Sequence, residues 1–187
     1  MDATEQRAAD RGNTRREKHT IAVTLKEAEA ERSRLVDHFI RKSAKKYGGF
    51  ESAAGGVNHL AFITNKLEET IEFYTQVIRL KLLRVRVDDG DARSTQVFFD
   101  MGRGELLAFL KIYKVNKANK MGLGGFHHFA LTVDGRQYTA VKKRLDEAKI
   151  SYTTITHEIL TTITTQDPNG IVLELSKWNI DPKKVRM

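Results

Sequence analysis

The sequence of 187 residues contains no cysteine and only two prolines. The lack of cysteine excludes disulfide bonds, thiolate metal ligands and a cysteine nucleophile, and it is compatible with a reducing compartment. No apolar run approaches the roughly 18 residues that a membrane-spanning helix needs. The first residues are charged rather than apolar, which is not typical of a secretory signal. We therefore expect a cytoplasmic protein without a membrane partner.

The charge balance is basic, with 32 Lys and Arg against 24 Asp and Glu and a net charge of +8. Such a balance can serve nucleic-acid binding. However, the two charge signs are mixed along the chain, and neither an aromatic-interleaved basic stripe nor a helix-turn-helix pattern is present. The sequence therefore argues against a nucleic-acid partner, while its apolar content of 40% predicts a globular domain.

Residues 1–50 differ from the rest because they are dense in both charge signs. Residues 1–20 are typical of a solvated arm. Thr24 and Glu27 have the spacing of a capping box, and Tyr47-Gly48-Gly49 would end the helix that follows. A partial apolar stripe would pack on the domain or on a partner: Leu25, Ala28, Leu35, Phe39 and Ile40. We therefore expect a basic arm with an amphipathic helix in residues 1–50.

Two segments repeat one pattern, Val57-Asn58-His59-Leu60-Ala61-Phe62 and Phe126-His127-His128-Phe129-Ala130-Leu131. Such a repeat within one chain indicates two copies of one supersecondary unit. Each copy predicts a strand, a helix and three strands. The predicted ranges are 57–64, 67–78, 80–87, 94–100 and 105–113, then 126–133, 136–148, 152–158, 161–166 and 171–177.

The predicted fold class is α+β, with two βαβββ modules at residues 56–113 and 125–178. Each module would have a helix on one face of its sheet, and the two sheets side by side would form an incomplete barrel, or cup. The domain would span residues 55–178, after the N-terminal helical extension and before a tail at 179–187.

Strand alternation places three metal-competent side chains on the cup face: His59, His128 and Glu174. By the same alternation, His127 should point away from His128. Two imidazoles and one carboxylate suit Fe(II), with Mn(II) a close competitor. Aligning the last turn of each copy puts Ala108 where Glu174 stands, so a fourth protein ligand is missing. We expect open metal positions for water and substrate.

Two arginines, Arg84 and Arg86, share one face of the predicted strand 80–87. An acidic substrate could meet them there. Charged residues at such positions are more often exposed to solvent.

The motifs resemble those of the vicinal oxygen chelate superfamily, which includes glyoxalase I, fosfomycin-resistance transferases, methylmalonyl-CoA epimerase, bleomycin-binding proteins and type I extradiol dioxygenases. The resemblance covers about residues 56–178 and implies the same three metal ligands. Glyoxalase I and the epimerases have a fourth protein ligand, so Ala108 argues against them. The resemblance to this superfamily is carried by the segments 58–62, Ile71-Glu72-Phe73-Tyr74, Leu106-Leu107-Ala108-Phe109, 128–131 and 167–175.

The strand Leu-Leu-Ala-Phe-Leu resembles the dioxygenase-like branch, which implies a small extradiol ring-cleaving enzyme with a divalent metal, Fe(II) preferred and Mn(II) possible. His157 would then be an acid/base, and Gln96, Phe98, Thr162 and Thr164 would line the substrate pocket. The resemblance also implies a small-molecule substrate and a homodimer. The alternatives are a Mn-dependent transferase or lyase of the fosfomycin-resistance type, and a metal-free protein that sequesters a small ligand.

Overall fold

The computed structural model describes residues 25–42, 56–87, 93–117 and 122–184. The chain divides into two compact units, Met1–Gly55 and Gly56–Met187. In the first unit, residues 25–35 are α-helical and η1 (Val36–Lys42) continues them as a π-helix. The predicted N-terminal helix is therefore present, whereas its predicted start at Thr24 and its predicted end near Tyr47 lie outside the described residues.

The surface of this helix carries ion pairs between residues three or four positions apart. Each pair joins its charged atoms at 2.6 Å: Glu29 with Arg32, Glu31 with Arg34, and Asp37 with Arg41. Residues at this spacing are neighbours on a helix surface, and exposed pairs contribute little to stability. The apolar residues of the stripe are exposed as well, and no residue of η1 is buried. No helix within the described ranges has the length and apolar character needed to cross a membrane.

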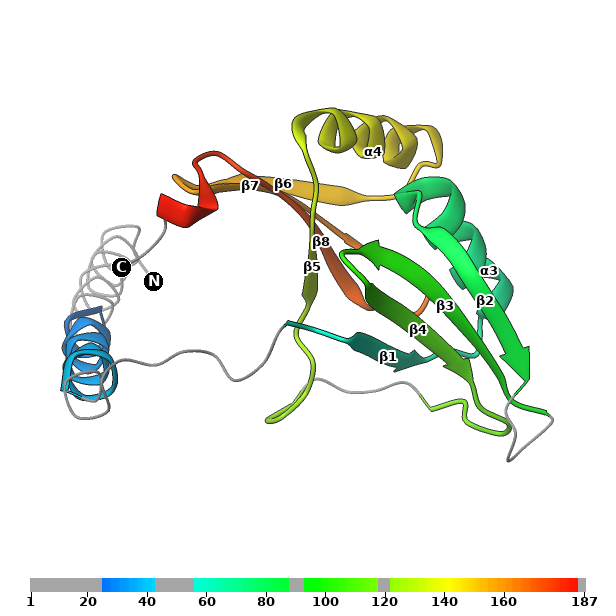
Figure 1. Cartoon of the computed structure of the whole chain (residues 1–187), viewed down its shortest axis with the longest axis horizontal. Helices are drawn as coiled ribbons and strands as arrows, with labels where there is room; N and C mark the ends of the chain where they lie inside the picture. Colours follow the sequence, from blue (N-terminus) through cyan, green and yellow to red (C-terminus); the bar gives the residue numbers. More distant parts are fainter. Residues whose placement is uncertain (1–24, 43–55, 88–92, 118–121, 185–187) are drawn as a thin grey trace, which may run out of the picture. The chain divides into compact units, whose positions relative to one another are not determined.

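The first module of the second unit forms sheet A. Its elements are β1 (His59–Ile63), α3 (Leu67–Glu72), η2 (Phe73–Ile78), β2 (Lys81–Val87), β3 (Thr95–Gly102) and β4 (Glu105–Lys111). The strand order is β1-β4-β3-β2, with β1 parallel to β4 and the other pairs antiparallel. Helix α3 and its extension η2 cover one face of this sheet (Figure 1).

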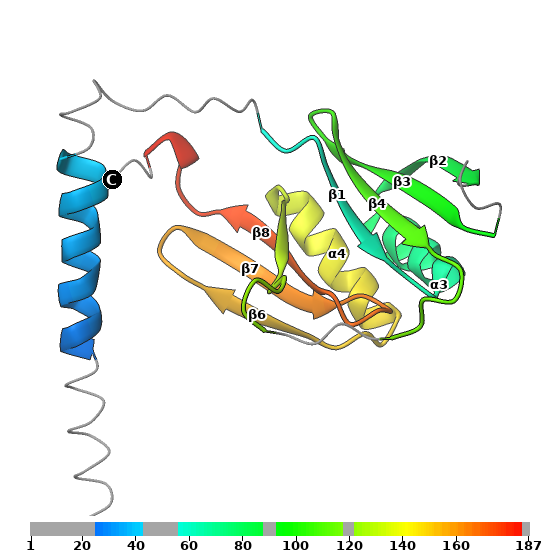
Figure 2. The same cartoon turned by 90° about the horizontal axis from the view of Figure 1, so that it is seen from below.

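The second module repeats this topology as sheet B. Its elements are β5 (Phe129–Thr132), α4 (Gly135–Glu147), β6 (Tyr152–Thr156), β7 (Leu160–Gln166) and β8 (Val172–Trp178), followed by η3 (Pro182–Lys184). The order β5-β8-β7-β6 matches that of sheet A, and α4 lies against the sheet (Figure 2). The predicted α+β class and the two βαβββ modules are confirmed. The two sheets do not close into one barrel, which agrees with the predicted incomplete barrel.

Local sequence signals explain where these elements begin and turn. Asp134 caps α4 in a capping box, because its Oδ1 accepts the Gln137 N–H at 2.7 Å and the Gln137 side chain accepts the Asp134 N–H at 2.8 Å. In the turn between β7 and β8, the Asp167 carboxylate accepts a backbone N–H from Asn169. Gly170 completes that turn at φ 81°, a conformation that glycine adopts without strain.

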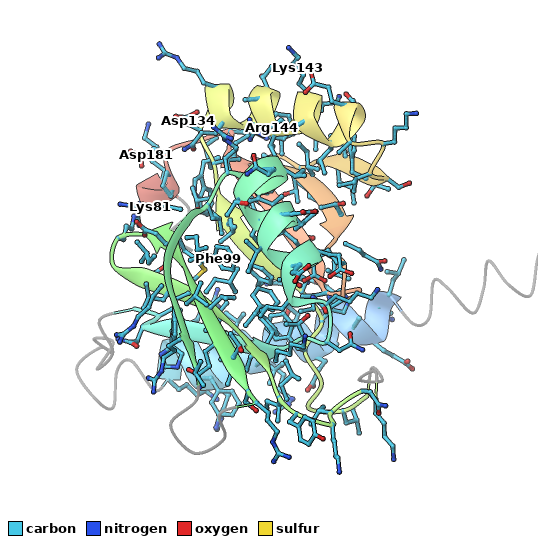
Figure 3. The ribbon with its side chains drawn as sticks, turned by 90° about the vertical axis from the view of Figure 1, so that its right-hand side faces the viewer. Lys81, Phe99, Asp134, Lys143, Arg144 and Asp181 are labelled. Atoms are coloured by element: carbon cyan, nitrogen blue, oxygen red, sulfur yellow. The ribbon has the colours of Figure 1, made fainter. Side chains whose placement is uncertain are left out.

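The helix-facing sides of both sheets share one apolar core. Phe62 of β1 packs against Phe109 of its own sheet and against Phe129 of the other module, with ring centroids 5.7 and 5.6 Å apart. Phe99 points into this interior (Figure 3). The buried members are Phe73, Tyr74, Ile78, Val97, Phe99, Leu107, Phe109, Phe129, Val141, Leu145, Ile163, Leu173 and Leu175.

Polar contacts also join the two modules on their helix side. The buried Tyr74 hydroxyl donates to Asp167 Oδ2 at 3.3 Å, and Arg144 Nε of α4 donates to the Val77 carbonyl of η2 at 2.6 Å. Burial raises the pKa of the Tyr74 phenol far above its ordinary value, and the neighbouring Asp167 carboxylate raises it further. The chain therefore holds its modules together through the faces that carry the helices.

Candidate metal centre

The face of sheet B that points away from α4 carries two of the predicted ligands. Ala130 pairs with Glu174, and Glu174 pairs with Thr164, so these side chains project from one face. Glu174 stands between Leu173 and Leu175, which are buried on the helix side. The period of two along β8 therefore turns the carboxylate to the open face, as the sequence predicts.

His128 and Glu174 meet on this open face. The distance from His128 Nε2 to Glu174 Oε2 is 3.6 Å, and their side chains are 39% and 26% exposed. Two ligands bound to one metal at about 2.1 Å lie about 3.0 Å apart at a right angle and about 3.4 Å apart in a tetrahedron. The pair thus fits one coordination shell after a small side-chain movement. Thr164 Oγ1 donates to the other carboxylate oxygen, Oε1, at 3.4 Å.

His127 lies against His128 rather than pointing away from it. The two Nδ1 atoms are 2.6 Å apart, and the ring centroids are 4.9 Å apart. The predicted alternation is wrong at this position because β5 begins only at Phe129, and the residues before it are not extended in a strand. When His128 donates from Nδ1 to His127, its Nε2 carries the lone pair that a metal requires.

His59 is the exposed first residue of β1 and has a similar local partner. Its Nδ1 lies 2.7 Å from Oδ1 of Asn58. An amide oxygen only accepts, so the hydrogen bond fixes the proton on Nδ1 and leaves the Nε2 lone pair available. In both copies, the residue immediately before the histidine holds its Nδ1.

The structure brings His128 and Glu174 together but does not bring His59 to them. Across residues 25–42, 56–87, 93–117 and 122–184, no group of three or more His, Asp or Glu side chains is placed to hold a metal. His59 stands on the open face of sheet A, whereas the pair stands on the open face of sheet B. The three-residue metal site therefore stays a prediction.

The strand registers show which residue of sheet A corresponds to Glu174. In sheet B, the residue two positions after His128 pairs with Glu174, and in sheet A the residue two positions after His59 pairs with Ala108. Ala108 is only 2% exposed and carries a methyl group. A metal bound between equivalent positions would therefore lack a fourth protein ligand on the side of sheet A.

The predicted pocket residues also lie on the open faces. Phe98 pairs with Ala108, and Gln96 lies two residues before Phe98 on β3. Gln96 and Phe98 are both half-buried. Thr162 is buried on β7, where its hydroxyl shares a hydrogen bond of 2.8 Å with Ser176. The structure therefore divides these pocket residues between the two sheets, as it divides the three predicted ligands.

His157 lies one residue beyond β6, in the turn that leads to β7, and its backbone N–H donates to the Leu160 carbonyl at 2.7 Å. Leu160 pairs with Trp178, which is four residues along β8 from Glu174. Four residues of strand span about 13 Å. The structure does not bring His157 to the pair of His128 and Glu174.

Asn58 and His127 are the residues that sequence reasoning missed. Each holds Nδ1 of the histidine that follows it and so orients the ring. The signal was present, because each copy carries a polar side chain directly before its histidine.

Comparison with known families decides the classification. The profile of the Glyoxalase/Bleomycin resistance protein/Dioxygenase superfamily matches residues 56–175. The chain belongs to this superfamily. The resemblance to vicinal oxygen chelate proteins is therefore confirmed, and the match covers both modules. A comparison with curated proteins finds no significant match.

Several solved structures share the fold of this superfamily member. One is a glyoxylase/bleomycin resistance protein/dioxygenase domain from Frankia sp. EAN1pec (TM-score 0.60, 17% identity, 68% of this chain and 100% of that one). A candidate dioxygenase from Bacillus subtilis has a TM-score of 0.56 and 24% identity, over 65% of this chain and 40% of that one. A mutant of the fosfomycin resistance protein FosX from Listeria monocytogenes, in complex with Mn(II) and 1S,2S-dihydroxypropylphosphonic acid, has a TM-score of 0.52 and 14% identity, over 70% of this chain and 97% of that one.

Proposed function

We propose that this protein is a divalent-metal-dependent enzyme whose metal is bound by His59, His128 and Glu174. The observation that carries the proposal is the approach of His128 Nε2 to Glu174 Oε2 at 3.6 Å on an open face. His59 supports it from the matched position of the other module, with its Nδ1 engaged and its Nε2 available. Two imidazoles and one carboxylate form a set that suits Fe(II) or Mn(II).

The reaction we propose resembles that of a small extradiol ring-cleaving dioxygenase, with Fe(II) preferred. Bound Fe(II) would supply a centre that chelates two adjacent substrate oxygens and orients O₂ beside them. The chain's own residues prepare this site. Thr164 donates a hydrogen bond to one oxygen of Glu174, and Ala108, with its methyl group, supplies no fourth ligand. Phe98, opposite Ala108, would contact the body of the substrate.

The homodimer in this proposal assembles the metal site from two copies. Within one chain, the open faces of sheets A and B lie on the sides opposite their shared helical core, and His59 does not join the other two ligands. A twofold axis that sets sheet A of one copy against sheet B of the other would bring the ligands together twice, because such an interface is self-complementary. Each site would combine His59 of one copy with the histidine and glutamate of the other.

Exposed apolar side chains on the same faces support this dimer. Ile63 shares the strand face of His59 on sheet A, Val57 lies two residues before His59, and Ile155 and Trp178 lie on the open face of sheet B. The exposed fractions of Val57, Ile63, Ile155 and Trp178 are 48%, 51%, 48% and 39%. Apolar side chains gathered on an open sheet face are typical of a surface that a partner covers.

A Mn-dependent transferase or lyase of the fosfomycin-resistance type is the second candidate, favoured by the Mn(II)-bound FosX structure with the same fold. Oxygen consumption with a panel of catechols would separate the two enzymes, because only the dioxygenase consumes O₂. A small-molecule ligand bound in the cup without metal or turnover would instead favour a sequestering protein.

Metal analysis of anaerobically purified protein tests the proposal directly. The wild type should hold about one Fe or Mn per chain, and Glu174→Ala should lose the metal because it removes the only negative ligand. Glu158→Ala is the matched control, since Glu158 is exposed in the turn between β6 and β7 of the same sheet. Full metal occupancy in Glu174→Ala would overturn the assignment.

A further inference from the structure

Strand β2 contains a bulge that changes the direction of its side chains. Leu82 pairs with Phe99, and the next paired residue is Arg84, which lies opposite Phe98. Without the extra residue, Arg84 would lie opposite Val97, whose side chain is buried on the helix side. Directly opposed residues project from one face, so the bulge turns Arg84 to the open face of sheet A.

The register then places Arg84 in one row with the vacant ligand position. Arg84 pairs with Phe98, Phe98 pairs with Ala108, and Ala108 pairs with Ala61, two residues after His59. The Cα atoms of Arg84 and Ala108 are two strand spacings apart, about 10 Å. A substrate that reached the metal beside Ala108 would lie over Phe98 and direct its far end toward Arg84.

The far end of this row is cationic. Arg86, two residues after Arg84 on β2, pairs with Gln96 and projects from the same face. Arg86 also interacts with a neighbouring group. Asp100 is the acidic residue of this face on β3, and its Oδ1 accepts the Gly102 N–H at 2.7 Å in the following turn. The guanidinium groups of Arg84 and Arg86 offer the planar donor geometry that binds carboxylate or phosphoryl groups.

From this row we infer that Arg84 and Arg86 bind an anionic group of the substrate. The substrate would be a small organic anion, in which an apolar segment separates a metal-chelating oxygen pair from a carboxylate or phosphoryl group. This inference rests on the proposed metal site, and it adds the class of substrate that the site accepts.

Protection of an exposed edge is the competing explanation, because β2 is the edge strand of sheet A and edges often carry charges and bulges. That role makes a different prediction. Loss of the arginines would then cause self-association and leave ligand preference unchanged.

The test compares two probes, catechol and 3,4-dihydroxybenzoate, which differ by one carboxylate at the end of the ring away from the chelating oxygens. Binding is measured anaerobically on metal-loaded protein. The wild type should bind 3,4-dihydroxybenzoate about 10- to 100-fold more tightly than catechol, and Arg84→Gln with Arg86→Gln should remove that preference without loss of metal. The control is Lys142→Gln with Lys143→Gln, which removes two charges from α4, where Lys143 points outward (Figure 3).

Equal binding of both probes by the wild type, or an unchanged preference in the arginine variant, would overturn the inference while metal binding still upheld the proposed function. Protein without metal would contradict the proposed function, and a second titration would then decide the inference. Benzoate added to metal-free wild type should shift the amide NMR signals of residues 81–87, and the arginine variant should show no shift. Absence of shifts in the wild type would overturn the inference.

Discussion

Mixing two inactive variants would distinguish a metal site shared between copies from a site within one chain. His59→Ala and Glu174→Ala each remove one proposed ligand, and both side chains are solvent-accessible, so neither change should unfold the domain. In a shared site, each homodimer of a variant has two damaged sites. In the heterodimer, both substitutions fall in one site, and the other site keeps all three ligands. The expected result is one metal per heterodimer, about half the wild-type content.

The assay is co-expression of the two variants with different affinity tags, followed by sequential anaerobic purification and metal analysis. An unsorted mixture with random pairing should recover about a quarter of wild-type sites, because about half of its dimers are heterodimers. His128→Ala paired with Glu174→Ala is the matched control. Both of these ligands come from sheet B, so each site of that heterodimer keeps one defect and should hold no metal.

A purified heterodimer without metal would refute the shared site, because a site within one chain gains nothing from mixing. Full metal occupancy in the His59→Ala homodimer would refute the role of His59 itself.

Two further substitutions test the core and the open ligand position. Tyr74→Phe removes the buried hydroxyl that donates to Asp167, and urea denaturation at pH 7 should show a loss of about 1–2 kcal/mol. The folded state keeps Tyr74 protonated, so above pH 10 only the unfolded state releases that proton. The free energy of unfolding of the wild type should therefore fall by about 1.4 kcal/mol per pH unit relative to the variant. An equal dependence of the unfolding free energy on pH in both proteins would contradict this. Ala108→Glu places an unpaired carboxylate at a buried position, so Tm of the metal-free protein should fall and added Mn(II) should raise it more than in the wild type. Equal metal-induced shifts would show that position 108 does not face the metal.

The sequence was sufficient for the parts of the fold that depend on local periodicity. The period of two along residues 171–177 put Glu174 on the face opposite Leu173 and Leu175, and the structure agrees. The repeat also predicted the correspondence of Ala108 with Glu174, which the registers of β1 with β4 and of β5 with β8 reproduce. These features follow from neighbouring residues, which determine the direction of a side chain within a regular strand.

The remaining features depend on where strands begin and on contacts between distant residues. His127 contacts His128 because β5 begins only at Phe129, directly after His128. Residue propensities do not determine at which residue a strand begins. Arg84 and Arg86 share a face in any regular strand, but the bulge before Arg84 decides which face it is. The joining of the modules through their helix faces depends on long-range packing, such as Phe62 on Phe129.

Because the two modules differ, each would contribute different groups to a site of the proposed dimer. Sheet B supplies the histidine and carboxylate pair, so it would hold most of the metal charge. Sheet A supplies one histidine, the methyl group of Ala108 and the row that leads to Arg84. In that dimer, the vacant side of the metal would face the sheet that carries Arg84 and Arg86. A substrate would bridge the two copies, chelating the metal held mainly by one and placing its anionic end on the other. Loss of the dimer should for this reason abolish metal binding and anion selectivity together.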